Sequence, residues 1–131
     1  MKQSGFQFTN PIISKINYEF HPNFIWDKEK GLSIANAFKT QIGRNQTENS
    51  AYVELTILLG NTDQQKSPFY IEMIIGASFK WDNAYTEKTI NDLLSINAPA
   101  LLLSYARPMV ATITNMSPYP SYRIPFYNFT E

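Results

Sequence analysis

The chain has 131 residues, enough for one domain with a sizeable core and too few for two ordinary ones, so we expect residues 1–131 to form a single domain. Its 11 basic and 11 acidic residues give zero formal net charge and form no basic run, which argues against a nucleic-acid partner. No cysteine is present, which excludes disulfides, and no apolar run approaches the roughly 20 residues of a bilayer span. We therefore expect a soluble, cytoplasmic protein without membrane insertion.

Four segments in the first two thirds of the chain show the pattern of β-strands. In "FQFTNPIISKINYEF" the second half alternates, with Ile16, Tyr18 and Phe20 on one side, while Pro11 predicts an edge strand or a bend. The other three are "LSIANAFKTQI", "AYVELTILL" and "PFYIEMIIGASFKW", which are rich in β-branched and aromatic residues. Their short connections predict a four-stranded antiparallel sheet.

The apolar period then becomes helical. "TEKTINDLLS" predicts a short helix, and "NAPALLLSYARPMVATITNM" predicts a long one with Asn97 as N-cap and Pro99 in its first turn. Pro108 removes a hydrogen bond to the carbonyl of Ser104, so we expect one helix that is kinked there. Its apolar arc of roughly 200° exceeds the stripe of about 100° that one sheet covers. Either the carboxy-terminal stretch or a second subunit must cover the rest of this apolar arc. The predicted fold class is α+β, with the sheet followed by the two helices.

Residues 98–129 carry motifs that resemble the SecB family of protein-export chaperones. The motifs are Tyr105-Ala106-Arg107 in the long helix, the Tyr119-Pro120 pair after it, and the closing residues Pro125, Asn128 and Phe129. The element order and the segments "YEFHP" and "FYIEMIIGASF" are similar to the family as well. Pro108 after the first motif and Lys15 at a usually acidic position are departures, and they indicate a divergent branch.

The resemblance implies a homotetramer built as a dimer of dimers, with the long helices between two sheets. The implied oligomer interface comprises Leu102, Tyr105, Ala106, Met109 and Ile113. It also implies a holdase without cofactor or metal, which binds unfolded or precursor polypeptides and passes them to a translocation motor ATPase. The acidic sheet-face residues Glu19 and Glu72 would dock the motor. The implied client-binding residues are Phe24, Trp26, Leu32, Ile34, Phe38, Ile71, Met73, Ile75, Tyr119, Tyr122 and Phe126.

Two stretches allow two interpretations each. The proline-aromatic stretch "PSYRIPFYNF" either seals the core after the long helix or lines the client groove with its rings, and both can hold at once. The loop "HPNFIWDKEKG" either packs its rings as a satellite cluster or presents them as an exposed apolar patch, which usually marks a binding surface.

Three classes of function follow. The leading hypothesis is a general holdase, and the alternative is a dedicated chaperone for one partner, for example a toxin–antitoxin pair. An enzyme comes third, because His21 is the only histidine, which excludes histidine triads and multi-histidine zinc sites. We expect His21 on the surface and Glu19, Glu54 and Glu72 as charges of a solvated face. We therefore predict no catalytic residue.

Overall fold

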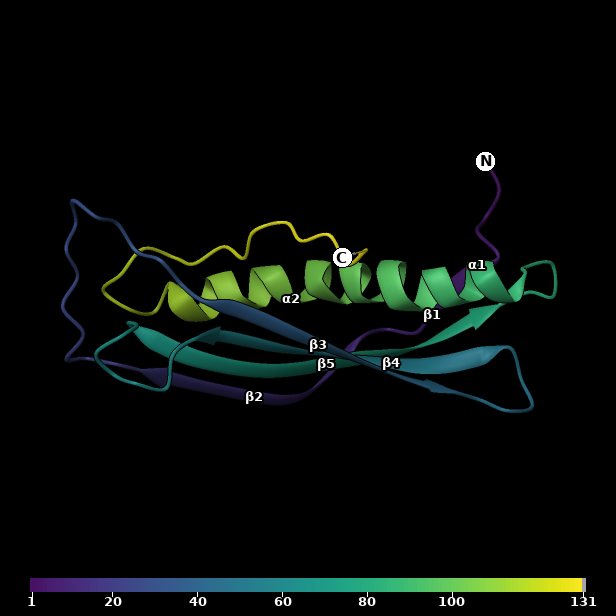
Figure 1. Cartoon of the computed structure of the whole chain (residues 1–131), viewed down its shortest axis with the longest axis horizontal. Helices are drawn as coiled ribbons and strands as arrows, with labels where there is room; N and C mark the ends of the chain where they lie inside the picture. Colours follow the sequence, from purple (N-terminus) through teal and green to yellow (C-terminus); the bar gives the residue numbers. More distant parts are fainter. Residues whose placement is uncertain (131) are drawn as a thin grey trace.

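The computed structural model describes residues 1–130 as an antiparallel β-sheet with a helical layer on one face (Figure 1). The α+β fold class is therefore confirmed. The strands are β1 (Phe6–Phe8), β2 (Ile12–Phe20), β3 (Asn36–Arg44), β4 (Ser50–Gly60) and β5 (Phe69–Trp81). The helical layer consists of α1 (Glu87–Asp92), the π-helical turn η1 (Leu93–Asn97) and α2 (Ala98–Thr114).

The sheet has five strands rather than four, because the expected first strand is divided in two. Both pieces pair antiparallel with β5: β2 runs from Phe20 opposite Phe69 to Ile12 opposite Gly76, and β1 continues alongside the second half of β5. Pro11 lies between the two pieces, where its missing amide hydrogen interrupts the ladder, as the sequence predicts. On its other side β5 pairs with β4, and β4 pairs with β3.

The predicted second strand begins later than expected. β3 starts at Asn36, so Leu32 and Ile34 lie in the loop before it. The partner strand explains this difference: β4 ends at Gly60, whose amide donates to the carbonyl of Ala35 at 2.8 Å. Gly60 has φ +82°, and a Cβ there would lie 2.1 Å from the carbonyl oxygen of Phe69. The chain turns away at this glycine, and residues before Ala35 have no strand to pair with.

The helical layer is continuous from α1 to α2, and the expected break at Asn97 is absent. Asn97 has helical angles (φ −76°, ψ −40°) and its side chain caps nothing. The amide of Ala98 instead bonds to the carbonyl of Leu93, five residues back, which is the wider spacing of a π turn. This turn precedes Pro99, which has no amide hydrogen for an ordinary α-helical bond.

α2 runs through Pro108 as one helix, as predicted. Pro108 and Ser104 both lie on the exposed side of α2. Solvent can therefore reach the carbonyl that lost its partner, which limits the cost of the proline.

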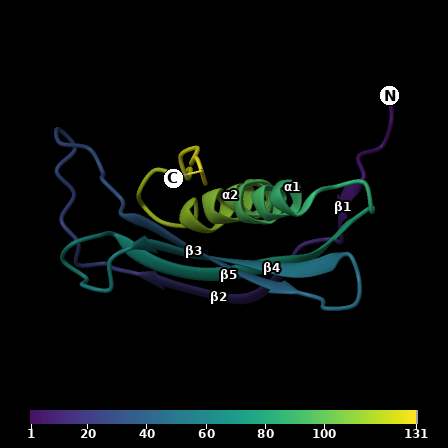
Figure 2. The ribbon, with the colours of Figure 1, turned by 45° about the vertical axis from the view of Figure 1, so that its right-hand side comes forward.

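The core lies between the sheet and α2 (Figures 1 and 2). Alternate residues of β4 and β5 face the helix and are buried. The helix contributes residues from its sheet-facing side. The buried residues include Val53, Leu55, Ile57, Leu59, Ile71, Met73, Ile75, Phe79, Leu94, Leu102, Ala106 and Val110.

Residues 115–130 form an extended segment, here called the C-terminal segment, that runs back along α2 (Figures 1 and 2). Its Ile124 is fully buried, and the Nε of Arg107 donates to the carbonyl of Ile124 at 2.7 Å. The amide of Tyr122 donates to Oγ1 of the buried Thr114 at 2.8 Å. The segment thus seals one side of the wide apolar arc of α2, as the first interpretation predicted.

An ion pair joins the end of β3 to the start of α1. The guanidinium of Arg44 donates two hydrogen bonds to the carboxylate of Glu87, at 2.8 and 3.3 Å. These bonds are the main reason why the pKa of Glu87 is lowered and the pKa of Arg44 is raised. Both groups face solvent, so the pair stabilises the fold only modestly.

Candidate functional site

Four rings form a cluster where the loop after β2 meets the C-terminal segment. Tyr119 is at its centre, with ring centroids 6.1 Å from Phe20, 6.0 Å from Phe24 and 5.7 Å from Trp26. These spacings lie within the range of favourable aromatic pairs. We call these four residues the loop cluster. All of them are partly exposed, so the cluster is both packed and accessible.

The loop cluster carries two polar groups, the hydroxyl of Tyr119 and the indole N–H of Trp26. The hydroxyl of Tyr119 donates to the carbonyl of Phe24 at 3.0 Å, which fixes the loop against the C-terminal segment. The Nε1 of Trp26 is buried and has no hydrogen-bond partner within residues 1–130. A buried donor without a partner is unfavourable, and this one would gain a backbone carbonyl as acceptor only if the loop cluster opened.

A second group of rings joins β3 to the C-terminal segment. Phe38 lies against Tyr127 and Phe129, with ring centroids at 4.7 and 5.9 Å. The amide of Asn36 bridges two hydroxyls: its Nδ2 donates to Tyr127 at 2.7 Å, and its Oδ1 accepts from Tyr122 at 2.9 Å. Burial raises the pKa of Tyr122, so this hydroxyl stays a donor at neutral pH. We call these five residues the β3 cluster.

The structure brings five of the predicted client-binding residues into these two clusters. Phe24, Trp26 and Tyr119 belong to the loop cluster, whereas Phe38 and Tyr122 belong to the β3 cluster. Three others lie nearby on the same loop or segment. These are Leu32 and Ile34, which are half-buried, and Phe126, which is 89% exposed.

Ile71, Met73 and Ile75 are not part of an accessible surface, and we remove them from the candidate site. Their side chains point to the face of β5 that α2 covers, and each is at most 2% exposed. Because alternate residues of a strand share a face, all three lie on the same side of β5. A polypeptide could reach that face only if α2 moved away.

Four residues of the clusters were missing from the prediction, namely Phe20, Asn36, Tyr127 and Phe129. Phe20 was read only as part of an alternating strand. In the C-terminal segment, prolines interrupt any regular period, so no pattern in the sequence separates the packed Tyr127 from the exposed Phe126. The role of Asn36 follows only from the two hydroxyls that flank it.

The side of α2 away from the C-terminal segment carries an exposed apolar stripe. Tyr105 and Met109 are each 44% exposed, and the ring of Phe8 lies edge-on to Tyr105 at 6.1 Å. Of the predicted oligomer interface, these two helix residues and the half-buried Ile113 remain available. Leu102 and Ala106 are fully buried against the protein's own sheet, so their assignment to an interface is wrong.

The sheet face away from α2 is polar at the β2–β5 junction. Glu19 and Glu72 lie on this face, as predicted for a docking site. The ammonium of Lys15 lies 3.0 Å from the carboxylate of Glu72 and neutralises it locally. Glu19 remains the free carboxylate of the two, with its nearest basic group in the structure at His21, 3.8 Å away.

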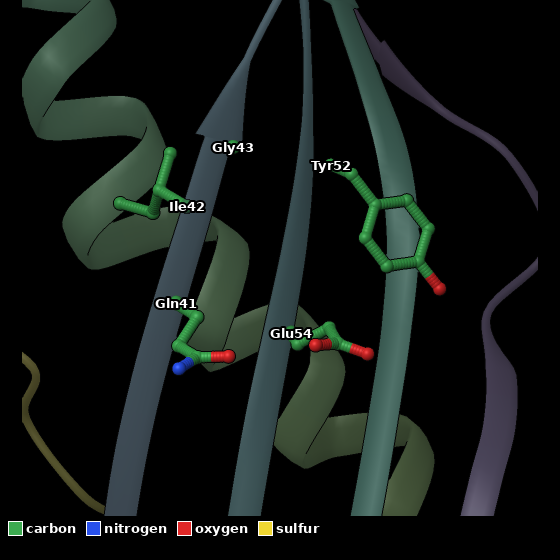
Figure 3. A pocket seen from close by; sticks show the side chains of 5 residues that line it. All are labelled: Gln41, Ile42, Gly43, Tyr52 and Glu54. Carbon is green, nitrogen blue, oxygen red and sulfur yellow. The ribbon is translucent and has the colours of Figure 1, made fainter.

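A shallow hollow opens on the same sheet face at β3 and β4 (Figure 3). It has a volume of about 460 Å³ and is lined by Gln41, Ile42, Gly43, Tyr52 and Glu54. Tyr52 lies flat over Gly76 of β5, where a Cβ would come within 2.7 to 2.9 Å of the Tyr52 side chain. The glycine therefore provides the space that this exposed ring occupies.

His21 is buried rather than exposed, which corrects the prediction. Its Nδ1 donates to the carbonyl of Ser67 at 2.9 Å, because a carbonyl can only accept. Its Nε2 has no hydrogen-bond partner within residues 1–130. The imidazole thus ties the end of β2 to the turn before β5. Nowhere in those residues do three or more His, Cys, Asp or Glu side chains form a group that could hold a metal ion.

Comparison with known proteins identifies the family. The family model for preprotein translocase subunit SecB matches residues 22–131. An uncharacterized protein of Methanocaldococcus jannaschii is 25% identical over 124 residues, which cover 93% of this chain and 78% of that protein. No helix within residues 1–130 is long and apolar enough to cross a bilayer.

Two solved structures are similar in fold. The SecB-like chaperone Rv1957 of Mycobacterium tuberculosis, in complex with a ChAD peptide from the HigA1 antitoxin, has a TM-score of 0.74 at 16% identity, covering 93% of this chain and 90% of that one. A protein of unknown function from Streptococcus agalactiae has a TM-score of 0.50 at 14% identity, covering 95% and 100%. The family match spans most of the sequence, and the chain belongs to the SecB family of preprotein translocase subunits.

Proposed function

We propose that this protein is a chaperone of the holdase type, which binds unfolded or precursor polypeptides and keeps them from collapsing. The observation that carries the proposal is the pair of partly exposed aromatic clusters that the C-terminal segment forms with the loop after β2 and with β3. Exposed apolar rings bind unfolded chains because burial of apolar surface is favourable and needs no particular sequence. No cofactor and no catalytic residue are required for this activity.

The proposed client-binding residues are those that remain accessible. They are Phe24, Trp26, Leu32, Ile34, Phe38, Tyr119, Tyr122 and Phe126, with Phe20, Tyr127 and Phe129 added from the structure. The indole N–H of Trp26 is buried without a partner within residues 1–130, so a client backbone could bond to it only where the loop cluster opens.

We propose further that the protein assembles as a homotetramer, a dimer of dimers, through the exposed stripe of α2. Tyr105 and Met109 lie on that stripe, and Phe8 and Ile16 extend it onto the β1–β2 edge of the sheet, each being 38 to 44% exposed. Apolar surface of this kind on a monomer usually marks an interface. A second subunit would cover the part of the helix arc that the C-terminal segment leaves open.

A translocation motor ATPase is the proposed second partner, with export as the pathway and the cytoplasm as the location. The acidic residues Glu19 and Glu72 are the proposed contact. The ion pair between Lys15 and Glu72 reduces the acidic character of this face, so Glu19 would carry most of a charge-based contact.

A dedicated chaperone for one partner, for example a toxin–antitoxin pair, is the second candidate function. One observation favours it: the structurally similar Rv1957 was solved with a peptide from an antitoxin. The two candidates differ in client range. A general holdase binds unrelated unfolded chains, whereas a dedicated one binds segments of its own partner.

The decisive experiment is gel filtration with light scattering. The protein is mixed with an unrelated chain diluted from denaturant, and the same chain kept folded is the control. Co-elution of the unfolded chain alone, with a tetramer mass for the free protein, is the expected result. Absence of co-elution with several unrelated chains would contradict a general holdase and leave the dedicated function.

A further inference from the structure

β3 is an open edge of the sheet. Within residues 1–130 it pairs with β4 alone, and the C-terminal segment contacts it through side chains. We propose that an extended client segment adds to this edge as a further β-strand, held by backbone hydrogen bonds. This inference rests on the proposed function and specifies how the client is bound.

The hydrogen bonds at both ends of the β3–β4 ladder show which backbone groups of β3 are free. Ala35 accepts from the amide of Gly60 at 2.8 Å, and the amide of Asn45 donates to Ser50 at 2.9 Å. The register between these two pairs has no bulge. In an antiparallel ladder hydrogen-bonded pairs alternate with non-bonded ones, so the odd-numbered residues of β3 bond to β4. The even-numbered residues therefore turn their N–H and C=O groups toward the open edge.

This edge lacks the devices that usually protect an exposed strand. Proteins guard such edges with proline, bulges, short strands or charges. β3 has nine residues, contains no proline and shows no register shift. Of its charged residues, Lys39 projects onto the sheet face opposite α2, and Arg44 is held by Glu87. The outward N–H and C=O groups of β3 therefore form a row of alternating hydrogen-bond donors and acceptors, and an extended backbone of another chain can pair with this row.

A hollow beside the edge adds a side-chain preference. It has a volume of about 360 Å³ and is lined by Asn36, Ala37, Phe38, Thr40, Ser95, Tyr127, Asn128 and Phe129. An added strand would direct every second side chain toward the α2 face of the sheet, where this hollow and the 41% exposed Ile42 lie. Its other side chains would lie beside Lys39 and Gln41. The preferred client segment thus alternates apolar and polar residues, with an aromatic or large aliphatic residue at the hollow.

The occupant we infer is a client segment and not a second copy of β3. The ring of Phe38 is already packed against Tyr127 and Phe129 of its own chain. A second copy of β3 would therefore have only Ile42 as a large apolar side chain to place against this edge. A client segment supplies the side chain that the hollow lacks.

Hydrogen exchange of the whole protein, followed by NMR, tests the proposal. The probe is a short synthetic peptide of alternating valine and threonine with one central phenylalanine. In the free protein the amides of Phe38, Thr40 and Ile42 should exchange quickly, and those of Lys39 and Gln41 slowly. Bound peptide should slow hydrogen exchange at the amides of Phe38, Thr40 and Ile42 by at least about tenfold, since each amide gains a hydrogen bond or becomes covered. Protection of those three amides in the free protein would instead indicate edge-to-edge pairing of two copies and overturn the proposal.

Two N-methylated forms of the peptide give an independent test with unchanged side chains. One carries methyl groups on the alternate amides that face β3, and the other carries them on the remaining amides. The first should bind at least about tenfold more weakly than the parent peptide, because two or three backbone hydrogen bonds are lost, and the second should bind like the parent. Equal affinities of both forms would overturn the edge inference and leave the holdase proposal standing. Failure of the parent peptide and of unfolded chains to bind at all would overturn both.

Discussion

The substitution Ile124→Ala tests how firmly the C-terminal segment is anchored to α2. Ile124 is fully buried, and its carbonyl accepts the hydrogen bond from Arg107. Truncation of a buried isoleucine to alanine costs about 2–5 kcal/mol of unfolding free energy. The segment is a single extended layer that can partly collapse into the space, so we expect the lower end, about 2–3 kcal/mol. Phe126→Ala, two residues away at an exposed site, should change the free energy by less than about 0.5 kcal/mol.

Urea unfolding followed by circular dichroism measures both variants, at one protein concentration because assembly contributes to apparent stability. The expected result is a lower midpoint for Ile124→Ala with an unchanged slope, and a midpoint like that of the wild type for Phe126→Ala. Equal midpoints for all three proteins would refute the packing of this segment against α2. A smaller slope for Ile124→Ala would mean that the segment detaches before the rest unfolds.

Four further predictions concern other parts of the structure. Trp26→Ala and Phe38→Ala should weaken co-elution of unfolded clients without changing the mass of the oligomer by light scattering; unchanged capture would remove both residues from the site. Met109→Glu places a charge on the exposed stripe of α2 and should break the oligomer, whereas a variant of unchanged mass would show that the interface lies elsewhere. Asn36→Ala deprives two tyrosine hydroxyls of their partner and should cost about 1–3 kcal/mol in urea unfolding, while a neutral result would mean that water replaces the amide. Because the folded-state pKa of Glu87 is lowered, its ion pair stabilises the fold above the unfolded pKa of about 4.3 and is lost as pH falls through the folded value. Glu87→Gln should therefore lower stability slightly at pH 7 and make no difference in acid, and a pH-independent difference would contradict the ion pair.

Much of the fold could be predicted because its signals are local. The strand pattern located β5, and the change to a helical period located α1 and α2. The start of β3 could not be predicted in this way, because it depends on where β4 turns away at Gly60. The π turn before Pro99 could not be predicted either. The sequence suggested that a helix begins at Asn97, whereas the helical layer continues across this residue.

The candidate site was harder to predict than the fold. The resemblance implied Ile71, Met73 and Ile75 as client-binding residues. Alternation could not correct this, because it shows which residues share a face of a strand and not which face a helix covers. The C-terminal segment has no regular period of apolar residues. Tyr127 packs, whereas Phe126 does not, because the side chain of Asn36 on β3 donates a hydrogen bond to the Tyr127 hydroxyl. The resemblance and the aromatic stretches pointed to these regions, and long-range contacts determine which rings form the clusters.

The position of the C-terminal segment in the chain also affects the order in which the protein can fold during synthesis. The C-terminal segment supplies Tyr119 to the loop cluster and Tyr127 to the β3 cluster, and it follows all the strands and helices of residues 1–130 in chain order. During synthesis the sheet and α2 therefore emerge before either cluster can be completed. A growing chain of this protein would expose one apolar side of α2 until the segment docks, so it would itself resemble a client at that stage. Docking of the C-terminal segment would thus change the chain from one that exposes apolar surface into one that can bind it in others.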